Sequence, residues 1–185
     1  MNRIESYPKL TIDIVKWIKD YYFYNNIDTL VVGVSGGIDS AVVSTLCAET
    51  GLPTYVITMP LDSKKENTEL SNLHAKELAE KYENVEILDI DLSGVFHTLI
   101  STIGLQTSKE GYTYNRDLIT NEHSNANTKS RLRMVTLYQI AGAVGGIVVG
   151  TGNKVEDYGV GFYTKYGDGG VDIAPIADLY KTEVW

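Results

Sequence analysis

The residues best suited to chemistry directly follow a stretch of β-branched residues near position 30. Residues 29–34 read Thr-Leu-Val-Val-Gly-Val and predict a strand buried on both faces of a parallel sheet. Residues 35–40, Ser-Gly-Gly-Ile-Asp-Ser, carry only one large side chain, so their backbone N–H groups stay uncovered. An apolar helix follows, and the positive end of its dipole favours an anion. The spacing therefore predicts a phosphate cradle at a strand-to-helix turn.

Asp39 is the unusual member of this loop. A carboxylate beside phosphates is repulsive unless a divalent cation lies between them. The loop is not a Walker A motif, because no Gly-Lys-Ser/Thr closes it, and it lacks the Gly-x-Gly-x-x-Gly spacing of a dinucleotide fold. A purely structural alternative is that Asp39 is a helix N-cap after an ordinary Gly-Gly turn. The six residues together favour a polyphosphate with a metal at Asp39.

The elements that must position this loop alternate regularly between strand and helix. This alternation, with short connections, predicts an α/β fold with a doubly wound, Rossmann-like parallel sheet and helices on both faces. Further strands are expected over residues 54–60, 84–90 and 145–150, and helices over residues 4–24, 65–82, 93–105 and 125–144. Residues 106–125 are polar and weakly patterned, so we expect a long loop or insertion there.

Ligands of an open α/β sheet bind at the carboxyl ends of its strands. This rule places residues 35–40, 59–60 and 151–156 along one edge, so the three loops should converge. Lys129, Arg131 and Arg133 fall near the start of the helix expected from residue 125. Three cations there oppose the helix dipole and indicate an anionic partner.

The last stretch, residues 162–175, is rich in Gly, Asp, Lys and Tyr and has little periodicity. Such a composition is typical of a substrate loop of fixed geometry. A helix is expected from about residue 178, and the chain stops at Trp185 inside it. We therefore interpret residues 1–185 as one domain that is truncated at its C-terminus.

Composition excludes several classes of protein. The formal net charge of −8 argues against a general nucleic-acid binder, which needs clustered Lys and Arg. The single cysteine, Cys47, can form neither an internal disulfide nor a cysteine-rich metal site, and its apolar neighbours predict a buried thiol. No signal-like h-region and no run of about 18 apolar residues is present, so we expect a cytoplasmic protein without a membrane contact.

Three further motifs carry a family resemblance. They are residues 127–134 (Asn-Thr-Lys-Ser-Arg-Leu-Arg-Met), 149–156 (Val-Gly-Thr-Gly-Asn-Lys-Val-Glu), and 164–170 (Thr-Lys-Tyr-Gly-Asp-Gly-Gly) with 175–181 (Pro-Ile-Ala-Asp-Leu-Tyr-Lys). Together with the loop at 35–40 they resemble the ammonia-dependent NAD synthetases of the ATP pyrophosphatase superfamily. The resemblance spans essentially the whole chain from the first helix onward.

The resemblance implies an activity. Such enzymes convert deamido-NAD (nicotinic acid adenine dinucleotide) to NAD. The pyridine carboxylate attacks the α-phosphate of ATP and releases pyrophosphate; ammonia then displaces AMP from the mixed anhydride. No side chain acts as a nucleophile, so catalysis would come from positioning and charge neutralisation.

The resemblance also implies site residues. ATP would be contacted by Gly33, Ser35, Gly36, Gly37, Ile38, Asp39, Ser40, Thr151 and Lys181. Mg²⁺ would be held by Asp39 and Glu156, and deamido-NAD by Arg131, Lys165 and Asp172. A homodimer is implied, with the first helix and residues 132–144 as candidate contacts. Without an amidase domain in this chain, free ammonia or a separate amidase would supply the nitrogen.

Each residue also has a structural interpretation. Lys165 and Lys181 can be solvated surface lysines, Arg131 a helix-face charge, and Glu156 a first-turn carboxylate that satisfies a helix dipole. Two other functions stay open at this point. One is a different ATP pyrophosphatase, such as a GMP synthetase or a tRNA-thiolating enzyme, although the chain lacks the paired cysteines and basic surface typical of the latter. The other is a catalytically incomplete nucleotide-binding or dimer-forming fragment.

Overall fold

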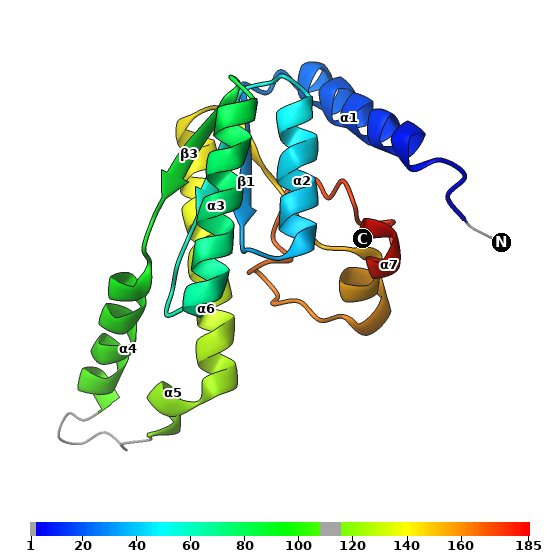
Figure 1. Cartoon of the computed structure of the whole chain (residues 1–185). Coiled ribbons are helices and arrows are strands. Elements are labelled where there is room, and N and C mark those ends of the chain that lie inside the picture. Colours follow the sequence, from blue (N-terminus) through cyan, green and yellow to red (C-terminus); the bar gives the residue numbers. More distant parts are fainter. Residues whose placement is uncertain (1–2, 108–115) are drawn as a thin grey trace.

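The computed structural model describes residues 3–107 and 116–185 and is built on one parallel sheet (Figure 1). Its strands are β1 (Thr29–Val34), β2 (Thr54–Thr58), β3 (Val85–Asp89) and β4 (Gly146–Val149). They lie in the order β3-β2-β1-β4, with all neighbours parallel and Val31 opposite both Tyr55 and Val148. The chain therefore reverses its direction of winding after β3, which places a crevice between the ends of β1 and β4.

Helices cover both faces of this sheet, as the strand–helix alternation predicted. One face packs on α1 (Tyr7–Tyr24), α2 (Ile38–Glu49) and α3 (Lys65–Lys81). The other packs on α4 (Ser93–Thr107) and α6 (Glu122–Ala143). Alternate residues of β1 supply the two cores: Leu30 and Val32 belong to the first, and Val31 to the second. All three are fully buried, which confirms a central strand and the doubly wound fold.

Two sequence expectations are corrected in the middle of the chain. Residues 106–125, expected as a long loop or an insertion, are not one long loop, because α4 continues through Thr107 and a short helix α5 spans Asp117–Thr120. The helix expected from residue 125 begins earlier, because α6 starts at Glu122. Residues 108–115 of the expected loop lie outside the described residues. The Asn121 side chain caps α6 by accepting the Ser124 N–H at 2.8 Å.

Because α6 starts earlier than expected, its dipole no longer indicates an anionic partner for the three cations near residue 131. Lys129, Arg131 and Arg133 lie two to three turns inside α6 rather than in its first turn. The helix dipole acts mainly at the terminal turn. The three cations therefore do not oppose it, and any anionic partner has to be inferred from their contacts instead.

After β4 the chain forms little regular structure, as its lack of periodicity predicted. A π-helix, η1, spans Val155–Val160, and a four-residue helix, α7, spans Lys181–Val184. Between them Ile173 forms a parallel bridge with Val149, which fastens this segment to the edge of β4. The helix expected from residue 178 thus begins three residues later, at Lys181.

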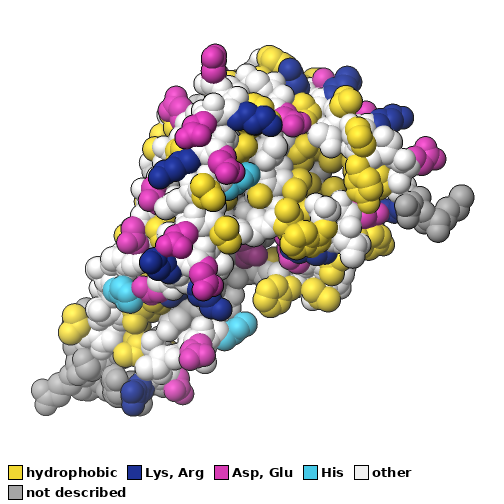
Figure 2. Space-filling view, in the orientation of Figure 1, with side chains coloured by type: hydrophobic (Ala, Val, Ile, Leu, Met, Phe, Trp, Pro, Cys, Tyr) yellow, Lys and Arg dark blue, Asp and Glu magenta, His cyan; other side chains and the backbone are white. Residues whose placement is uncertain are grey.

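The surface is mixed in character (Figure 2). Over α3, charges of both signs are interspersed, while apolar side chains gather near α1. On α1, Ile12 and Phe23 are exposed, whereas Ile18 and Tyr22 of the same helix are buried in the core. Within the described residues, no helix combines the length and apolar character needed to cross a membrane.

Candidate active site

The loop after β1 is held open by its own serines. The Ser35 N–H donates to Ser40 Oγ at 3.1 Å, and Ser40 Oγ donates to the Gly37 carbonyl at 2.9 Å. The Gly37 N–H donates to Ser35 Oγ at 3.3 Å. Gly37 is the N-cap of α2, so the first N–H groups of that helix have no intrahelical acceptor. The serines therefore fix the turn, and the N–H groups at the N-terminus of α2 provide the geometry of a phosphate site.

Glycine is required at position 36 by both conformation and space. Gly36 has a φ of +84°, in the left-handed region, and a Cβ there would lie 2.6 Å from the Asn67 carbonyl oxygen. Asn67 belongs to the first turn of α3. The phosphate loop is thus packed directly against α3, and a side chain at position 36 would push the two apart.

Asp39 is not the N-cap of α2, because Gly37 has that position. Instead its Oδ2 accepts a hydrogen bond from the ammonium group of Lys181. The same ammonium donates to Glu156 Oε1 at 3.3 Å. The structure therefore brings together both expected metal carboxylates, Asp39 and Glu156, and one expected ATP contact, Lys181. The three residues come from separate parts of the chain.

Charge at this cluster is only partly balanced. Burial alone would lower the pKa of Lys181, but its hydrogen bond to Asp39 and the charges of Asp39 and Glu156 raise that pKa overall. Beside it, burial raises the pKa of Asp157, and the neighbouring charges of Glu156 and Asp168 add to the effect. The cluster thus holds more negative than positive charge, and a further cation would be stabilised there.

The donor set fits Mg²⁺. Asp39 Oδ1 is buried and accepts no hydrogen bond from any described residue. No group of three or more His, Cys, Asp and Glu side chains among the described residues could hold a metal. Mg²⁺ is commonly bound by one or two carboxylates together with substrate phosphates. Asp39 and Glu156 would supply the protein oxygens, and a polyphosphate the others.

Asn153, which the sequence interpretation missed, positions Glu156. This side chain is fully buried, and its Oδ1 accepts the N–H groups of Val155 at 3.0 Å and Glu156 at 3.2 Å. The bonds fix the start of η1, the helix that carries Glu156. An Asn directly after the glycine turn is a capping signal that could have revealed this role.

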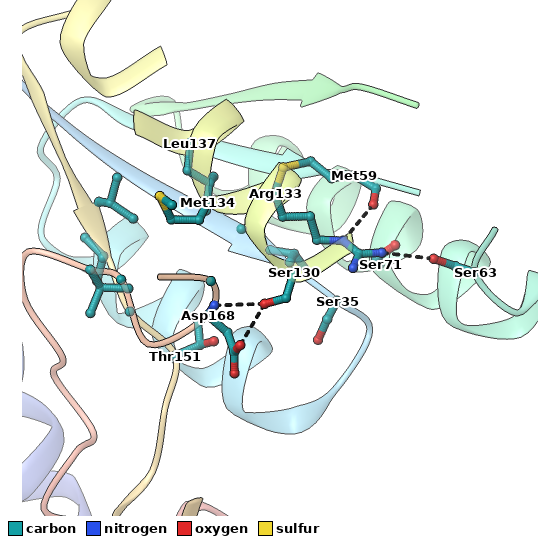
Figure 3. Close-up of a pocket in the computed structure, with 18 of the residues that line it drawn as sticks. Ser35, Met59, Ser63, Ser71, Ser130, Arg133, Met134, Leu137, Thr151 and Asp168 are labelled. Atoms are coloured by element: carbon teal, nitrogen blue, oxygen red, sulfur yellow. Dashed lines mark hydrogen bonds between the residues drawn. The ribbon is translucent and has the colours of Figure 1, made fainter. Parts of the chain in front are cut away.

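Two adjoining cavities open at the carboxyl ends of the strands. The smaller, of about 220 Å³, is lined by Ser35, Gly37, Asp39, Ser40, Thr151, Gly152, Glu156, Asp157, Phe162 and Asp168. The larger, of about 490 Å³, lies between the ends of β1, β2 and β4 and helices α3 and α6 (Figure 3). Ser35, Thr151 and Asp168 line both. The predicted convergence of the three loops is confirmed, and the phosphate loop adjoins a cavity in which Met59, Met134, Leu137 and Val148 provide apolar wall.

Arg133 is a second residue that the sequence interpretation left out of the site. Its side chain reaches from α6 toward the end of β2, where Nε donates to the Met59 carbonyl at 3.1 Å and Nη2 to Ser63 Oγ at 3.4 Å (Figure 3). Burial lowers its pKa below the ordinary value. No ion pair with a carboxylate is formed by Arg133 among the described residues. A guanidinium in a cavity wall without a charged partner can meet an anionic or electron-rich ligand group.

The glycine-rich loop is anchored to α6 by a polar network. Asp168 Oδ1 accepts hydrogen bonds from Ser130 Oγ at 2.7 Å and from the Thr164 N–H at 2.9 Å. Ser130 Oγ accepts in turn from the Asp168 N–H at 2.9 Å, and Thr164 Oγ1 donates to Asn127 at 2.8 Å. The network joins the two motifs around residues 130 and 165 and gives the cavity a fixed wall.

The residues expected to hold the dinucleotide are placed differently from one another. Arg131 and Lys165 are adjacent, since Arg131 Nε donates to the Lys165 carbonyl at 3.2 Å. Both are exposed outside the two cavities. Asp172 is engaged within the fold: it accepts from Tyr138 Oη at 3.1 Å and from the Val148 N–H at 2.7 Å. Burial raises the pKa of Tyr138 to about 12, and the charge of Asp172 adds to this.

Comparison with known proteins gives the family. Residues 10–185 match the family model described as NAD synthase. The chain belongs to the NAD synthase family. The NH(3)-dependent NAD(+) synthetase of Methanosarcina acetivorans is 37% identical over 180 residues, which are 97% of this chain and 65% of that protein. The enzyme of the same name from Carboxydothermus hydrogenoformans is 36% identical over 97% of this chain and 68% of its own length.

Solved structures of this family have the same architecture. The NMN synthetase of Francisella tularensis superposes with a TM-score of 0.82 at 30% identity, covering 98% of this chain and 68% of that one. The NH3-dependent NAD synthetase of Campylobacter jejuni gives a TM-score of 0.79 at 29% identity, with coverages of 98% and 71%. This chain thus spans about two thirds of the length of its family relatives.

Proposed function

We propose that this protein is an ammonia-dependent NAD synthetase, an ATP-dependent carbon–nitrogen ligase. It converts deamido-NAD, ATP and ammonia to NAD, AMP and pyrophosphate through an adenylated carboxylate. The observation that carries the proposal is the convergence of Asp39, Glu156 and Lys181 on the phosphate loop, beside a cavity large enough for a nucleoside. The names of the curated relatives support the same activity.

ATP would bind across both cavities. The adenosine part occupies the larger one, between the end of β2 and α6, where apolar side chains and the guanidinium of Arg133 form the wall. The phosphates meet Ser35 to Ser40, Gly33 lines the inner end, and Thr151 lies between the two spaces. This placement puts the β- and γ-phosphates on the backbone donors of the loop and leaves the α-phosphate facing outward.

Charge neutralisation drives the first step. Attack by the pyridine carboxylate on the α-phosphorus transfers negative charge to the departing pyrophosphate. Lys181 lies within reach of that charge, and the N-terminus of α2 adds a fixed partial positive charge. Mg²⁺ bound at Asp39 and Glu156 would supply further neutralisation of the phosphate oxygens.

The second step needs no protein nucleophile. Ammonia adds to the activated carbonyl carbon, the C–O bond to AMP breaks, and one proton is lost to give the amide. Residues near the α-phosphate need only hold the anhydride and exclude water. Arg131 and Lys165 would contact the dinucleotide from outside the ATP cavities. Asp172 would contribute mainly by fixing Tyr138 and β4, since its carboxylate is already bonded to both.

A second candidate is the amidation of nicotinic acid mononucleotide. It is favoured by the likeness to the NMN synthetase of Francisella tularensis. The phosphate loop and metal carboxylates would act identically, and only the substrate contacts outside the ATP site would differ.

The experiment offers the protein each of three candidate substrates in turn. The purified chain of residues 1–185 is incubated with ATP, Mg²⁺ and ammonium, and with deamido-NAD, nicotinic acid mononucleotide or xanthosine monophosphate. We expect pyrophosphate and AMP in equal amounts with NAD, from deamido-NAD alone. Preference for the mononucleotide would establish the second candidate, and turnover of xanthosine monophosphate would reject both. ATP binding without any amide product would leave a nucleotide-binding fragment.

We further propose a homodimer formed through α1. Ile12 and Phe23 leave an apolar strip on that helix. Residues 132–144 are less suited than the sequence suggested, because Leu132, Leu137 and Ile140 pack in the core and only Val135 is strongly exposed among the large apolar residues. Sedimentation of the wild type and of an Ile12→Asp variant would test this assembly.

A further inference from the structure

The N-terminal arm, residues 3–6, makes a long-range connection to the last helix. Arg3 Nε donates to Glu183 Oε1 at 3.1 Å, and Arg3 Nη2 donates to Glu183 Oε2 at 2.6 Å. The same Nη2 donates to the Asp178 carbonyl oxygen at 2.5 Å. An arginine that binds both oxygens of a carboxylate fixes its direction as well as its distance. The arm therefore holds α7 in one orientation.

Lys154 holds the same segment. Its Nζ donates to Asp178 Oδ1 at 2.6 Å, and its backbone N–H donates to the Leu179 carbonyl at 2.9 Å. The ring of Tyr180 lies 5.0 Å from Arg3 Cζ and 5.3 Å from Lys154 Nζ, within cation–π range of both. Residues 178–180 are thus fastened by two cations from distant parts of the chain.

Lys181 follows directly from this fastened segment. Glu183 Oε2 also accepts the Tyr180 N–H at 2.8 Å, which caps α7 immediately before Lys181. Arg3 therefore contacts residues on both sides of Lys181 in the sequence, and the Lys181 ammonium in turn reaches Asp39 and Glu156. Arg3 and the phosphate site are thus linked through one short, capped turn.

This connection orients α7 but contributes little to the stability of the whole fold. Ion pairs at a protein surface contribute little to folding, and the Arg3 side chain is 39% exposed. The Glu183 side chain is 13% exposed, and the hydrogen bond from Arg3 holds its pKa below the usual range. Losing Arg3 should therefore leave the fold intact but release α7.

We propose that Arg3 is a positioning residue for ATP binding, which acts by orienting α7 so that Lys181 faces the phosphate loop. The proposal rests on the proposed role of Lys181 as an ATP contact. Nothing in it requires Arg3 to touch a ligand. It predicts that Arg3, at the start of the chain, controls the ATP affinity of the site formed by the phosphate loop, Glu156 and Lys181.

The test compares Arg3→Met with a matched control, Lys16→Met. Lys16 also carries a positive charge in an ion pair, with Asp20 at 3.0 Å, but on the exposed face of α1. ATP affinity is measured by calorimetry with Mg²⁺ present, and the reactivity of Lys181 by trace acetylation and peptide mass spectrometry. For Arg3→Met we expect about 3- to 10-fold weaker ATP binding and several-fold faster acetylation of Lys181. The KM for deamido-NAD should be unchanged. Arg3→Lys, which keeps the charge but lacks the planar fork that binds both Glu183 oxygens, should be intermediate.

Several results would overturn the proposal. One is ATP affinity and Lys181 acetylation in Arg3→Met equal to those of Lys16→Met. Another is a large fall in melting temperature with unchanged ATP affinity per folded molecule, which would make Arg3 merely structural. Should the wild type bind ATP but form no amide from any acid, the proposed function fails on its own. The binding and acetylation measurements would still decide the role of Arg3.

Discussion

Lys181 and Asp39, 142 positions apart in the chain, are joined by a hydrogen-bonded ion pair at the phosphate loop. Glu156 shares the same ammonium at 3.3 Å. The pair links the last helix to the first residues of α2, so the loop and the C-terminal segment form one unit. It also identifies Asp39 as a residue that meets cations rather than one that caps a helix.

Replacement of Asp39 by Asn should therefore affect turnover far more than folding. The substitution keeps the shape and removes the charge that faces Lys181 and the expected metal position. We expect at least about 100-fold slower Mg²⁺-dependent turnover, the scale of losing one charge-stabilising group. The melting temperature should change by no more than about 3 °C. Steady-state kinetics with thermal unfolding checks this, and equal losses of stability and activity would contradict it.

Replacement of Gly36 by Ala should destabilise the loop. The residue has a positive φ, and its new Cβ would collide with the Asn67 carbonyl oxygen. We expect a loss of about 1–3 kcal/mol in the free energy of unfolding, with weaker ATP binding. Gly94→Ala on α4 is the control, because a Cβ there meets nothing within 4 Å. It should stabilise the helix by about 0.5–1 kcal/mol. Urea unfolding of both variants measures the difference, and similar values would refute the steric argument.

Arg133 should contribute to ATP binding, and Arg131 to deamido-NAD binding. Arg133→Met removes a guanidinium from the cavity wall and the donor to the Met59 carbonyl, so ATP should bind at least about 10-fold more weakly, equivalent to about 1.4 kcal/mol. Arg131→Met, outside that cavity, should raise the KM for deamido-NAD and leave ATP affinity within about twofold. Calorimetry and kinetics on both variants separate the roles. The reverse pattern would reject our placement of ATP.

His74 should make stability depend on pH. Its Nε2 lies 2.8 Å from Ser44 Oγ, and burial lowers its pKa, with the charge of Glu77 opposing the shift. A base with a depressed pKa in the folded state contributes stability that is present above its unfolded pKa of about 6.5 and is lost as pH falls through the folded value. Between pH 7.5 and 5.5 the melting temperature should fall less in His74→Gln than in the wild type. Gln retains a hydrogen-bonding group toward Ser44. Parallel slopes for the two proteins would exclude this role.

Much of the site was predictable because its residues follow strands. Ser35 to Ser40 come directly after β1, Glu156 lies in the loop and helix that follow β4, and the carboxyl ends of parallel strands share one edge. The start of α6 was missed although Asn121 is a recognisable N-cap, because the following residues are polar and show no helical periodicity. Arg133 was noted only as one of three cations that indicated an anionic partner: its place in the cavity wall depends on reaching Met59, 74 positions away, which only the packing of α6 on the sheet reveals.

Asp172 shows a different limit of sequence interpretation. The family resemblance implied a substrate contact, whereas its carboxylate bonds Tyr138 and the Val148 N–H. Local composition cannot distinguish an aspartate that meets a ligand from one that closes the edge of a strand. A contact of the dinucleotide with Asp172 stays a prediction, as do the roles of Lys165 and the dimer.

The most direct test of the account follows the oxygen of the substrate carboxylate. Deamido-NAD labelled with ¹⁸O in both carboxylate oxygens is converted with ATP, Mg²⁺ and ammonia, and AMP and NAD are examined by mass spectrometry. Attack on the α-phosphorus followed by displacement of AMP predicts one ¹⁸O in AMP, one in the amide of NAD, and none in pyrophosphate. Unlabelled AMP, or ADP and phosphate in place of AMP and pyrophosphate, would contradict the assignment of this loop as a pyrophosphate leaving-group site.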